Sequence, residues 1–114
     1  LELGKLVKPK DGIPFFSNLG VARLLFSHDW QELKEFYWEI LGELKEPELK
    51  ETLETYLNQG CDLKKTADQL YLHPNSLRYR LRKIEEVLET KLDEFETKVD
   101  LAVAMKIKAL LKLE

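Results

Sequence analysis

Residues 62–89 decide the fold, and they read DLKKTADQLYLHPNSLRYRLRKIEEVLE. Asp62 is a good N-cap for a helix over Leu63–Leu70, and Pro74 suits the first turn of the next helix. That second helix carries an apolar stripe at helical spacing, formed by Leu77, Leu81, Ile84 and Leu88. The stretch therefore predicts two helices joined by a turn of about three residues, which is a helix-turn-helix.

The two predicted helices have the pattern of a unit that packs on one side and is exposed on the other. Ala67 is small enough to let the helices cross closely, and the small core around it is completed by Leu63, Leu70, Leu72 and Leu77. On a helical wheel, the apolar stripe of the second helix lies opposite a polar set made of Asn75, Arg78, Tyr79 and Arg82. Such an arrangement lets one helix enter the DNA major groove while its partner braces it.

The polar set contains side chains of the types that read DNA bases. Asn pairs bidentately with adenine and Arg with guanine when the first turns of a helix lie in the major groove. We therefore predict base contacts by Asn75, Arg78 and Tyr79. Two other roles are open for Tyr79. It can stack on a sugar, or it can be a core residue, as tyrosines at helical spacing often are.

Phosphate contacts fix the position of a protein on DNA without reading its sequence. The predicted phosphate contacts come from Lys64, Lys65, His73, Ser76, Arg80, Arg82 and Lys83. Two of these residues have structural alternatives. His73 can cap the second helix or be a turn residue without a ligand, and Arg80, which borders the apolar stripe, can form an ion pair with an acid such as Asp68.

The rest of the chain after residue 14 is also predicted to be helical. We expect further helices over Phe15–Phe26, from the N-cap Asp29 to about Leu44, from Pro47 to just before Gly60, and over about Phe95–Leu111. Trp30 and Trp38 are interpreted as core residues rather than as a cofactor site, and His28 as a cap. Strand signals are nearly absent, so the predicted fold class is all-α, with about six helices around the helix-turn-helix unit.

Residues 1–14 differ in composition from the rest of the chain. Gly4, Pro9, Gly12 and Pro14 prevent a stable helix there, so we interpret this segment as a linker or as the remnant of an upstream domain. Residues 15–114 are expected to form one helical DNA-binding domain that contains the helix-turn-helix over 62–89.

Charge is distributed unevenly along the chain. The net charge is −3, but residues 28–60 hold nine acids and three bases, whereas residues 62–83 hold six bases and two acids. The first segment would repel a phosphate backbone and the second would attract it.

Other function classes lack support in the sequence. Cys61 is the only cysteine, so we expect a structural role for it and no metal site. No glycine-rich phosphate-binding motif occurs, so we expect no cofactor and no enzyme activity. The longest apolar stretch, residues 101–113, is interrupted by lysines and is too short to cross a bilayer, so we expect a cytoplasmic protein without membrane contact.

Three motifs together resemble a known family: TLETYLNQG at 52–60, LKKTADQL at 63–70 and HPNSLRYRLRKIE at 73–85. They look like the C-terminal helix-turn-helix domain of PucR and CdaR-type bacterial transcription regulators, and the likeness covers roughly residues 15–112. It implies a sequence-specific module for double-stranded DNA that follows an effector-sensing domain in a regulator of a catabolic operon. Two positions depart from the family pattern, because Tyr71 replaces the usual turn glycine and Pro74 replaces a residue that is more often basic.

Assembly and a rival function remain open at this point. The last helix is apolar around most of its circumference, so we predict a two-fold dimer on DNA with this helix or the Trp30–Trp38 face at or near the interface. The alternative is that the second and third predicted helices cover this surface within one chain. The rival function is a helical protein–protein interaction module without nucleic-acid binding, which the acidic segment 28–60 favours.

Overall fold

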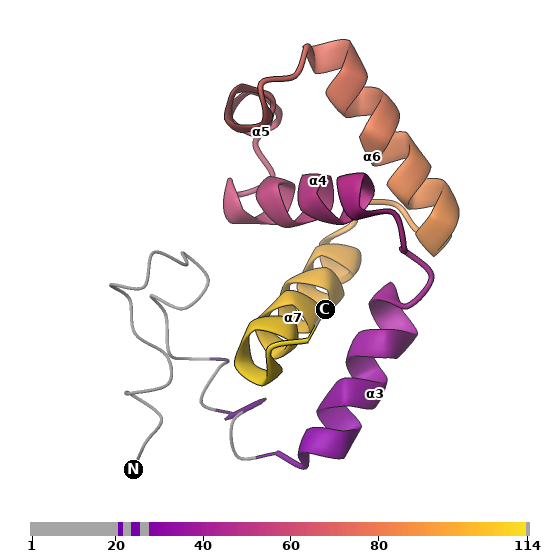
Figure 1. Ribbon diagram of the computed structural model, residues 1–114, viewed down its shortest axis with the longest axis vertical. Coiled ribbons are helices and arrows are strands. Elements are labelled where there is room, and N and C mark those ends of the chain that lie inside the picture. The colour runs from indigo at the N-terminus through magenta and orange to yellow at the C-terminus, as the bar shows by residue number, and fades with distance from the viewer. Residues whose placement is uncertain (1–20, 22–23, 26–27, 114) are drawn as a thin grey trace.

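The computed structural model describes residues 21, 24–25 and 28–113, and no strand occurs among them (Figure 1). Residues 28–113 contain five helices. They are α3 (Trp30–Leu41), α4 (Pro47–Asn58), α5 (Leu63–Leu70), α6 (Pro74–Leu88) and α7 (Phe95–Leu111). The all-α prediction is confirmed. The segment 1–14 and most of the helix expected over Phe15–Phe26 lie outside the described residues. No helix in the described part is long and apolar enough to span a membrane.

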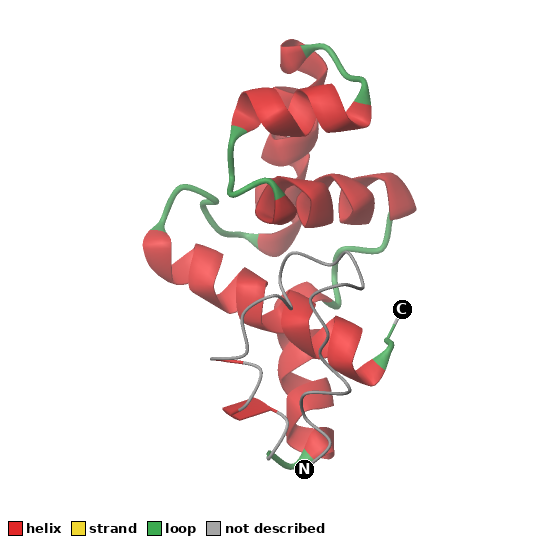
Figure 2. Cartoon of the chain, turned by 90° about the vertical axis from the view of Figure 1, so that its left-hand side faces the viewer, coloured by secondary structure: helices red, strands yellow, loops and turns green. Residues whose placement is uncertain are grey.

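The helices form two groups that meet at α4. The first group is the pair of α3 and α7, which lie side by side, and the second consists of α4, α5 and α6 (Figures 1 and 2). Helix α4 packs against α5, α6 and α7, so it connects the helix-turn-helix to the pair. One inter-helix ion pair supports this junction, since Lys108 Nζ of α7 lies 3.1 Å from Glu54 Oε2 of α4.

Helix α3 begins as predicted and ends three residues earlier. Asp29 is its N-cap, with the side-chain Oδ1 accepting from the Gln31 amide at 3.0 Å. His28 is not the cap, because its imidazole Nε2 instead lies 3.0 Å from Glu32 Oε1. The helix stops at Leu41 because Gly42 is a poor helix former and the Leu44 amide donates back to the Leu41 carbonyl at 3.0 Å.

Helix α4 supplies the centre of the core. Its buried side chains form one stripe along the helix and are those of Leu49, Thr52, Leu53, Tyr56 and Leu57. Burial is the main cause that raises the pKa of Tyr56 to about 12, with the neighbouring Cys61 contributing. Tyr56 is therefore a neutral core residue at physiological pH.

The packing of α3 on α7 shows that the two tryptophans of α3 are not core residues, contrary to the interpretation of the sequence. Helix α3 buries Leu33, Tyr37 and Leu41, whereas α7 buries Leu101, Ala104, Met105 and Ile107. Trp30 and Trp38 are not core residues, since they remain 54% and 50% exposed. They lie off the buried stripe, and the ring of Trp38 makes an edge contact with Tyr37, with centroids 4.9 Å apart.

The apolar surface of α7 is largely covered within the chain. Its buried side chains pack between α3 and α4, as the single-chain alternative requires. Phe95 and Val99 stay exposed near the start of α7. The last helix is therefore a weaker candidate for a dimer interface than its sequence suggests.

Candidate nucleic-acid interface

The turn between α5 and α6 consists of Tyr71, Leu72 and His73, the three residues predicted to separate the two helices. Tyr71 has φ 57° and ψ 44°, so this residue adopts a strained left-handed backbone at the position where the family pattern has glycine. The Leu72 amide donates to the Ala67 carbonyl at 2.9 Å and closes the end of α5. The Tyr71 side chain is 94% exposed, so its own packing does not offset the strain of about 1 kcal/mol.

Side-chain caps fix where both helices begin. Asp62 Oδ1 accepts from the Lys65 amide at 2.9 Å, which confirms it as the N-cap of α5. His73 Nδ1 accepts from the Asn75 amide at 3.0 Å, so His73 does cap α6. Because Nδ1 is the acceptor, this tautomer carries its hydrogen on Nε2. His73 thus has a structural role and keeps one exposed donor.

A small core holds α5 against α6. Ala67 is 3% exposed and Leu77 is 1% exposed, as expected for residues at the helix crossing. Leu70 and Leu72 are half-buried against them. Leu63 departs from its predicted place, since it is 43% exposed and lines a groove of about 400 Å³ between the two helices.

The outer face of α6 presents the predicted base-reading side chains. Asn75, Arg78, Tyr79 and Arg82 are all exposed, whereas Leu77, Leu81 and Ile84 on the opposite face are buried. Tyr79 is 58% exposed, which excludes the core alternative for it. Arg78 Nη1 donates to Asn75 Oδ1 at 3.0 Å, so these two side chains lie together at the start of α6.

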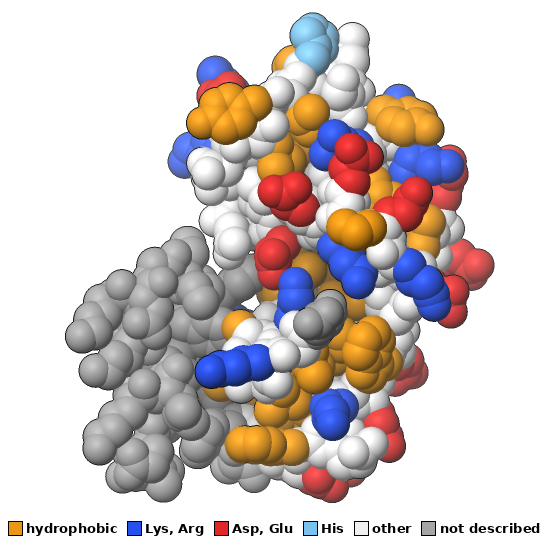
Figure 3. All heavy atoms as spheres, viewed as in Figure 1, with side chains coloured by type: hydrophobic (Ala, Val, Ile, Leu, Met, Phe, Trp, Pro, Cys, Tyr) orange, Lys and Arg blue, Asp and Glu red, His pale blue; other side chains and the backbone are white. Residues whose placement is uncertain are grey.

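The predicted phosphate-binding residues are spread around this face. Lys65, His73 and Ser76 are exposed, and so is Lys64, whose Nζ lies 3.1 Å from Asp68 Oδ2. Lys83 is half-buried, with Nζ 3.8 Å from Glu86 Oε1. On the face shown in Figure 3, Lys and Arg side chains alternate with Asp and Glu, so the positive charge forms no unbroken patch.

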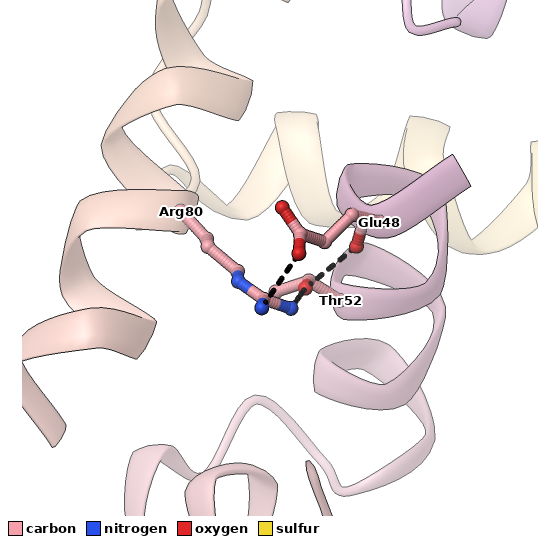
Figure 4. A network of polar contacts seen from close by, with 3 residues as sticks. All are labelled: Glu48, Thr52 and Arg80. Carbon is pink, nitrogen blue, oxygen red and sulfur yellow. Dashed lines mark hydrogen bonds and ion pairs between the residues drawn. The ribbon is translucent and has the colours of Figure 1, made fainter. Parts of the chain in front are cut away.

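Arg80 is the exception among the predicted contacts. Its side chain is only 20% exposed, and its Nη2 lies 3.0 Å from Glu48 Oε2. Nη1 donates to Thr52 Oγ1 at 3.2 Å, and Figure 4 shows the three side chains pointing toward one another from α6 and α4. The structure therefore confirms that Arg80 forms an ion pair, but its partner is Glu48. Asp68, the acid suggested by the sequence, pairs with Lys64 instead.

Sequence reasoning missed Glu48 and Thr52 as residues of this region. A threonine inside the apolar stripe of α4 gives no clear signal of a distant partner, because its buried hydroxyl already donates to the Glu48 carbonyl of the same helix at 2.8 Å. The sequence does not show that Thr52 Oγ1 also accepts from Arg80, which lies 28 positions away. In the described part of the chain, no group of His, Cys, Asp and Glu side chains could hold a metal ion.

Comparison with known proteins identifies relatives over most of the chain. The family model of the PucR C-terminal helix-turn-helix domain matches residues 49–107. The purine catabolism regulatory protein of Bacillus subtilis (strain 168) is 34% identical over 116 residues, which cover 97% of this chain and 22% of that protein. The proline-responsive transcriptional activator PutR of the same organism is 32% identical over 109 residues, covering 89% of this chain and 26% of PutR.

A third relative is an uncharacterized protein of Haemophilus influenzae, which is 36% identical over 105 residues, 89% of this chain and 28% of that protein. The chain thus spans about a quarter of the length of these relatives. No solved structure matches the chain.

Proposed function

The chain belongs to the family of PucR C-terminal helix-turn-helix domains, and from this premise we propose that it binds double-stranded DNA sequence-specifically as the DNA-reading module of a bacterial transcription regulator. The observation that carries the proposal is the division of α6 into two faces. One face packs on α4 and α5, and the other exposes Asn75, Arg78, Tyr79 and Arg82. A helix of this kind can enter the major groove without giving up its core.

In the proposed complex, the start of α6 reads the bases. Asn75, Arg78 and Tyr79 contact base edges, since they lie in the first two turns and are exposed. The hydrogen bond between Arg78 and Asn75 supports this assignment because it holds a guanidinium and an amide side by side in the free chain. Less side-chain freedom is then lost on binding.

The proposed phosphate contacts surround this reading face. They come from Lys64, Lys65, His73, Ser76, Arg82 and Lys83, of which all but Lys83 are exposed. Arg80 is not in this set, because Glu48 and Thr52 already hold its guanidinium.

The names of the relatives support a role in the control of catabolic genes. One is a purine catabolism regulatory protein and another a proline-responsive activator. We propose that this chain is part of a cytoplasmic regulator of a catabolic operon. Residues 15–114 form the DNA-binding domain of the proposed regulator. An effector-sensing domain upstream, connected through residues 1–14, completes the proposed regulator.

We also propose that two copies bind one DNA site as a two-fold dimer. A single helix-turn-helix covers one half-site, and two of them bind more tightly and more specifically. The Trp30–Trp38 face is the better candidate for the interface, since both indoles are half-exposed while the apolar face of α7 is largely covered by α3 and α4.

A selection from a random duplex pool tests the proposed function. The retained duplexes are sequenced, and the affinity of the chain for them is measured over a range of salt concentrations. We expect one enriched motif and an affinity that falls steeply with salt, because binding releases counterions. Retention of no duplex at low salt would contradict the proposal and favour the protein-interaction alternative.

A further inference from the structure

The polar network that joins α6 to α4 has a geometry that apolar packing lacks. Arg80 Nη2 binds Glu48 Oε2 at 3.0 Å, Arg80 Nη1 binds Thr52 Oγ1 at 3.2 Å, and the Thr52 hydroxyl donates to the Glu48 carbonyl at 2.8 Å (Figure 4). Thr52 is 0% exposed, so its position is set by the core of α4. The guanidinium is therefore held at two points by one rigid helix.

Apolar packing also joins α6 to the core around α4. The side chains of α6 that pack into the core around α4 are Leu77, Leu81 and Ile84. Such contacts are non-directional, so they fix the rotation of α6 about its own axis less sharply than a directed polar contact does. A planar guanidinium with two hydrogen bonds has a fixed direction and restricts this rotation.

Rotation of α6 matters for the reading face. Side chains end about 5–6 Å from a helix axis, so a rotation of about 20° displaces them by about 2 Å. A hydrogen bond to a base edge tolerates much less than that displacement. Since Arg80 lies two positions after Arg78, its anchoring acts on the same turns of α6 that hold Asn75 and Arg78.

The network also affects the charge beside the reading face. A hollow of about 560 Å³ is lined by Glu46 and Glu48 of the α4 start and by Asn75, Ser76 and Tyr79 of α6. Arg80 partly neutralises Glu48 at this hollow. A phosphate that approaches Ser76 therefore meets less negative charge.

From these contacts we propose that Arg80, held by Glu48 and Thr52, is a positioning residue for DNA recognition, which sets the rotation of α6 and so the sequence discrimination of Asn75 and Arg78. The inference rests on the proposed function. It assigns Arg80 a role that differs both from a phosphate contact and from a general contribution to stability.

The test compares variants for the ratio of two affinities, one for the selected duplex and one for a random duplex. Glu48→Gln removes the charge that holds Arg80, and Thr52→Val keeps the shape of the side chain and removes its oxygen. The matched control is Glu54→Gln, which weakens the other inter-helix ion pair of α4, the one with Lys108. Circular dichroism confirms that each variant is folded at the temperature of the measurement.

We expect Glu48→Gln and Thr52→Val to lower the affinity ratio about tenfold, whereas Glu54→Gln leaves it within about twofold. Arg80→Lys, which keeps the charge and loses the planar fork, should lower the ratio as well. If Thr52→Val does not fold, the affinity ratio of Glu48→Gln alone tests the positioning role. This variant should fold, because the Glu48 side chain is mostly exposed.

Two results would overturn the positioning role. An unchanged ratio with a lower thermal midpoint would show that the network serves stability only. Tighter binding of both duplexes with a steeper salt slope would show that the freed Arg80 binds phosphate. If the unaltered chain shows no preference for any duplex, both the proposed function and the positioning role fail. If the unaltered chain prefers the selected duplex and the variants keep the same preference, only the positioning role fails.

Discussion

The α5–α6 helix-turn-helix and the α3–α7 pair use their side chains in different ways. In α5 only Thr66 and Ala67 are buried, and α6 keeps one whole face exposed for polar side chains. The α3–α7 pair instead buries apolar residues from both helices against each other and leaves two tryptophans half-exposed.

The difference shows that the α5–α6 helix-turn-helix depends on a core that it supplies only in part. Helix α4 contacts both regions and buries Leu49, Thr52, Leu53, Tyr56 and Leu57. With α4 beneath them, the short α5 and the polar outer face of α6 need contribute few buried residues. We therefore expect the two regions to fold as one unit while only one of them binds DNA.

The largest expected effect is a loss of unfolding free energy, and it tests by mutation whether the two regions fold as one unit. Ile84 of α6 is 0% exposed, so Ile84→Ala should cost about 2–5 kcal/mol of unfolding free energy. Both tryptophans lie in α3, so their fluorescence reports on the other region. Fluorescence and circular dichroism should show the same lowered denaturation midpoint.

The exposed Val99 provides the control, since Val99→Ala should change the midpoint little. A fluorescence midpoint that stays in place while the dichroism signal shifts would show that the two regions unfold separately.

The next effect concerns discrimination by the reading face. Asn75→Ala or Arg78→Ala should weaken binding to the selected duplex by about 1–3 kcal/mol and binding to a random duplex much less, because base contacts carry the specificity. Lys34→Ala on the exposed side of α3 is the control and should change neither affinity. Equal losses on both duplexes would remove these two residues from the base-reading set.

A smaller effect is expected from the strained turn. Tyr71→Gly should raise the unfolding free energy by about 1 kcal/mol, because glycine adopts the left-handed backbone without the clash of a Cβ atom. Tyr71→Phe keeps the strain and is the matched control. A Tyr71→Gly variant less stable than that control would mean that the tyrosine ring itself stabilises the turn.

The smallest effect separates phosphate contacts from exposed charges in general. Lys65→Ala and Arg82→Ala should each make the slope of log affinity against log salt shallower by about 0.9. The measurement is a fluorescence anisotropy titration of a random duplex at four or more salt concentrations. A slope as steep as that of the Lys34→Ala control would show that these side chains do not neutralise phosphate.

The helix boundaries of the α5–α6 region could be read from the sequence because the signals there are local. Asp62 and Pro74 mark the starts of α5 and α6, and Gly60 follows the end of α4 with φ 68°. Each acts through its own backbone or the next few residues. The polar face of α6 was predictable for the same reason, since helical periodicity fixes which side chains lie opposite the apolar stripe.

The features that escaped prediction depend on distant parts of the chain. Helix α3 has apolar side chains on more than one face, and periodicity does not show which of them α7 covers, so the prediction that Trp30 and Trp38 are core residues is wrong. The position of Arg80 beside the apolar stripe is visible in the sequence, but its partner Glu48 lies 32 positions earlier on another helix. Only the packing of α6 on α4 brings the two together.

The central claim is that DNA binds to the outer face of α6 and not to the α3–α7 pair, and an NMR titration tests it most directly. The ¹⁵N-labelled chain is titrated with the selected duplex while amide shifts are followed for all helices. We predict that the largest changes fall at the starts of α5 and α6, around Lys65, Asn75 and Arg78, with small changes along α3. Large changes along α3 or α7 together with an undisturbed α6 would contradict the account.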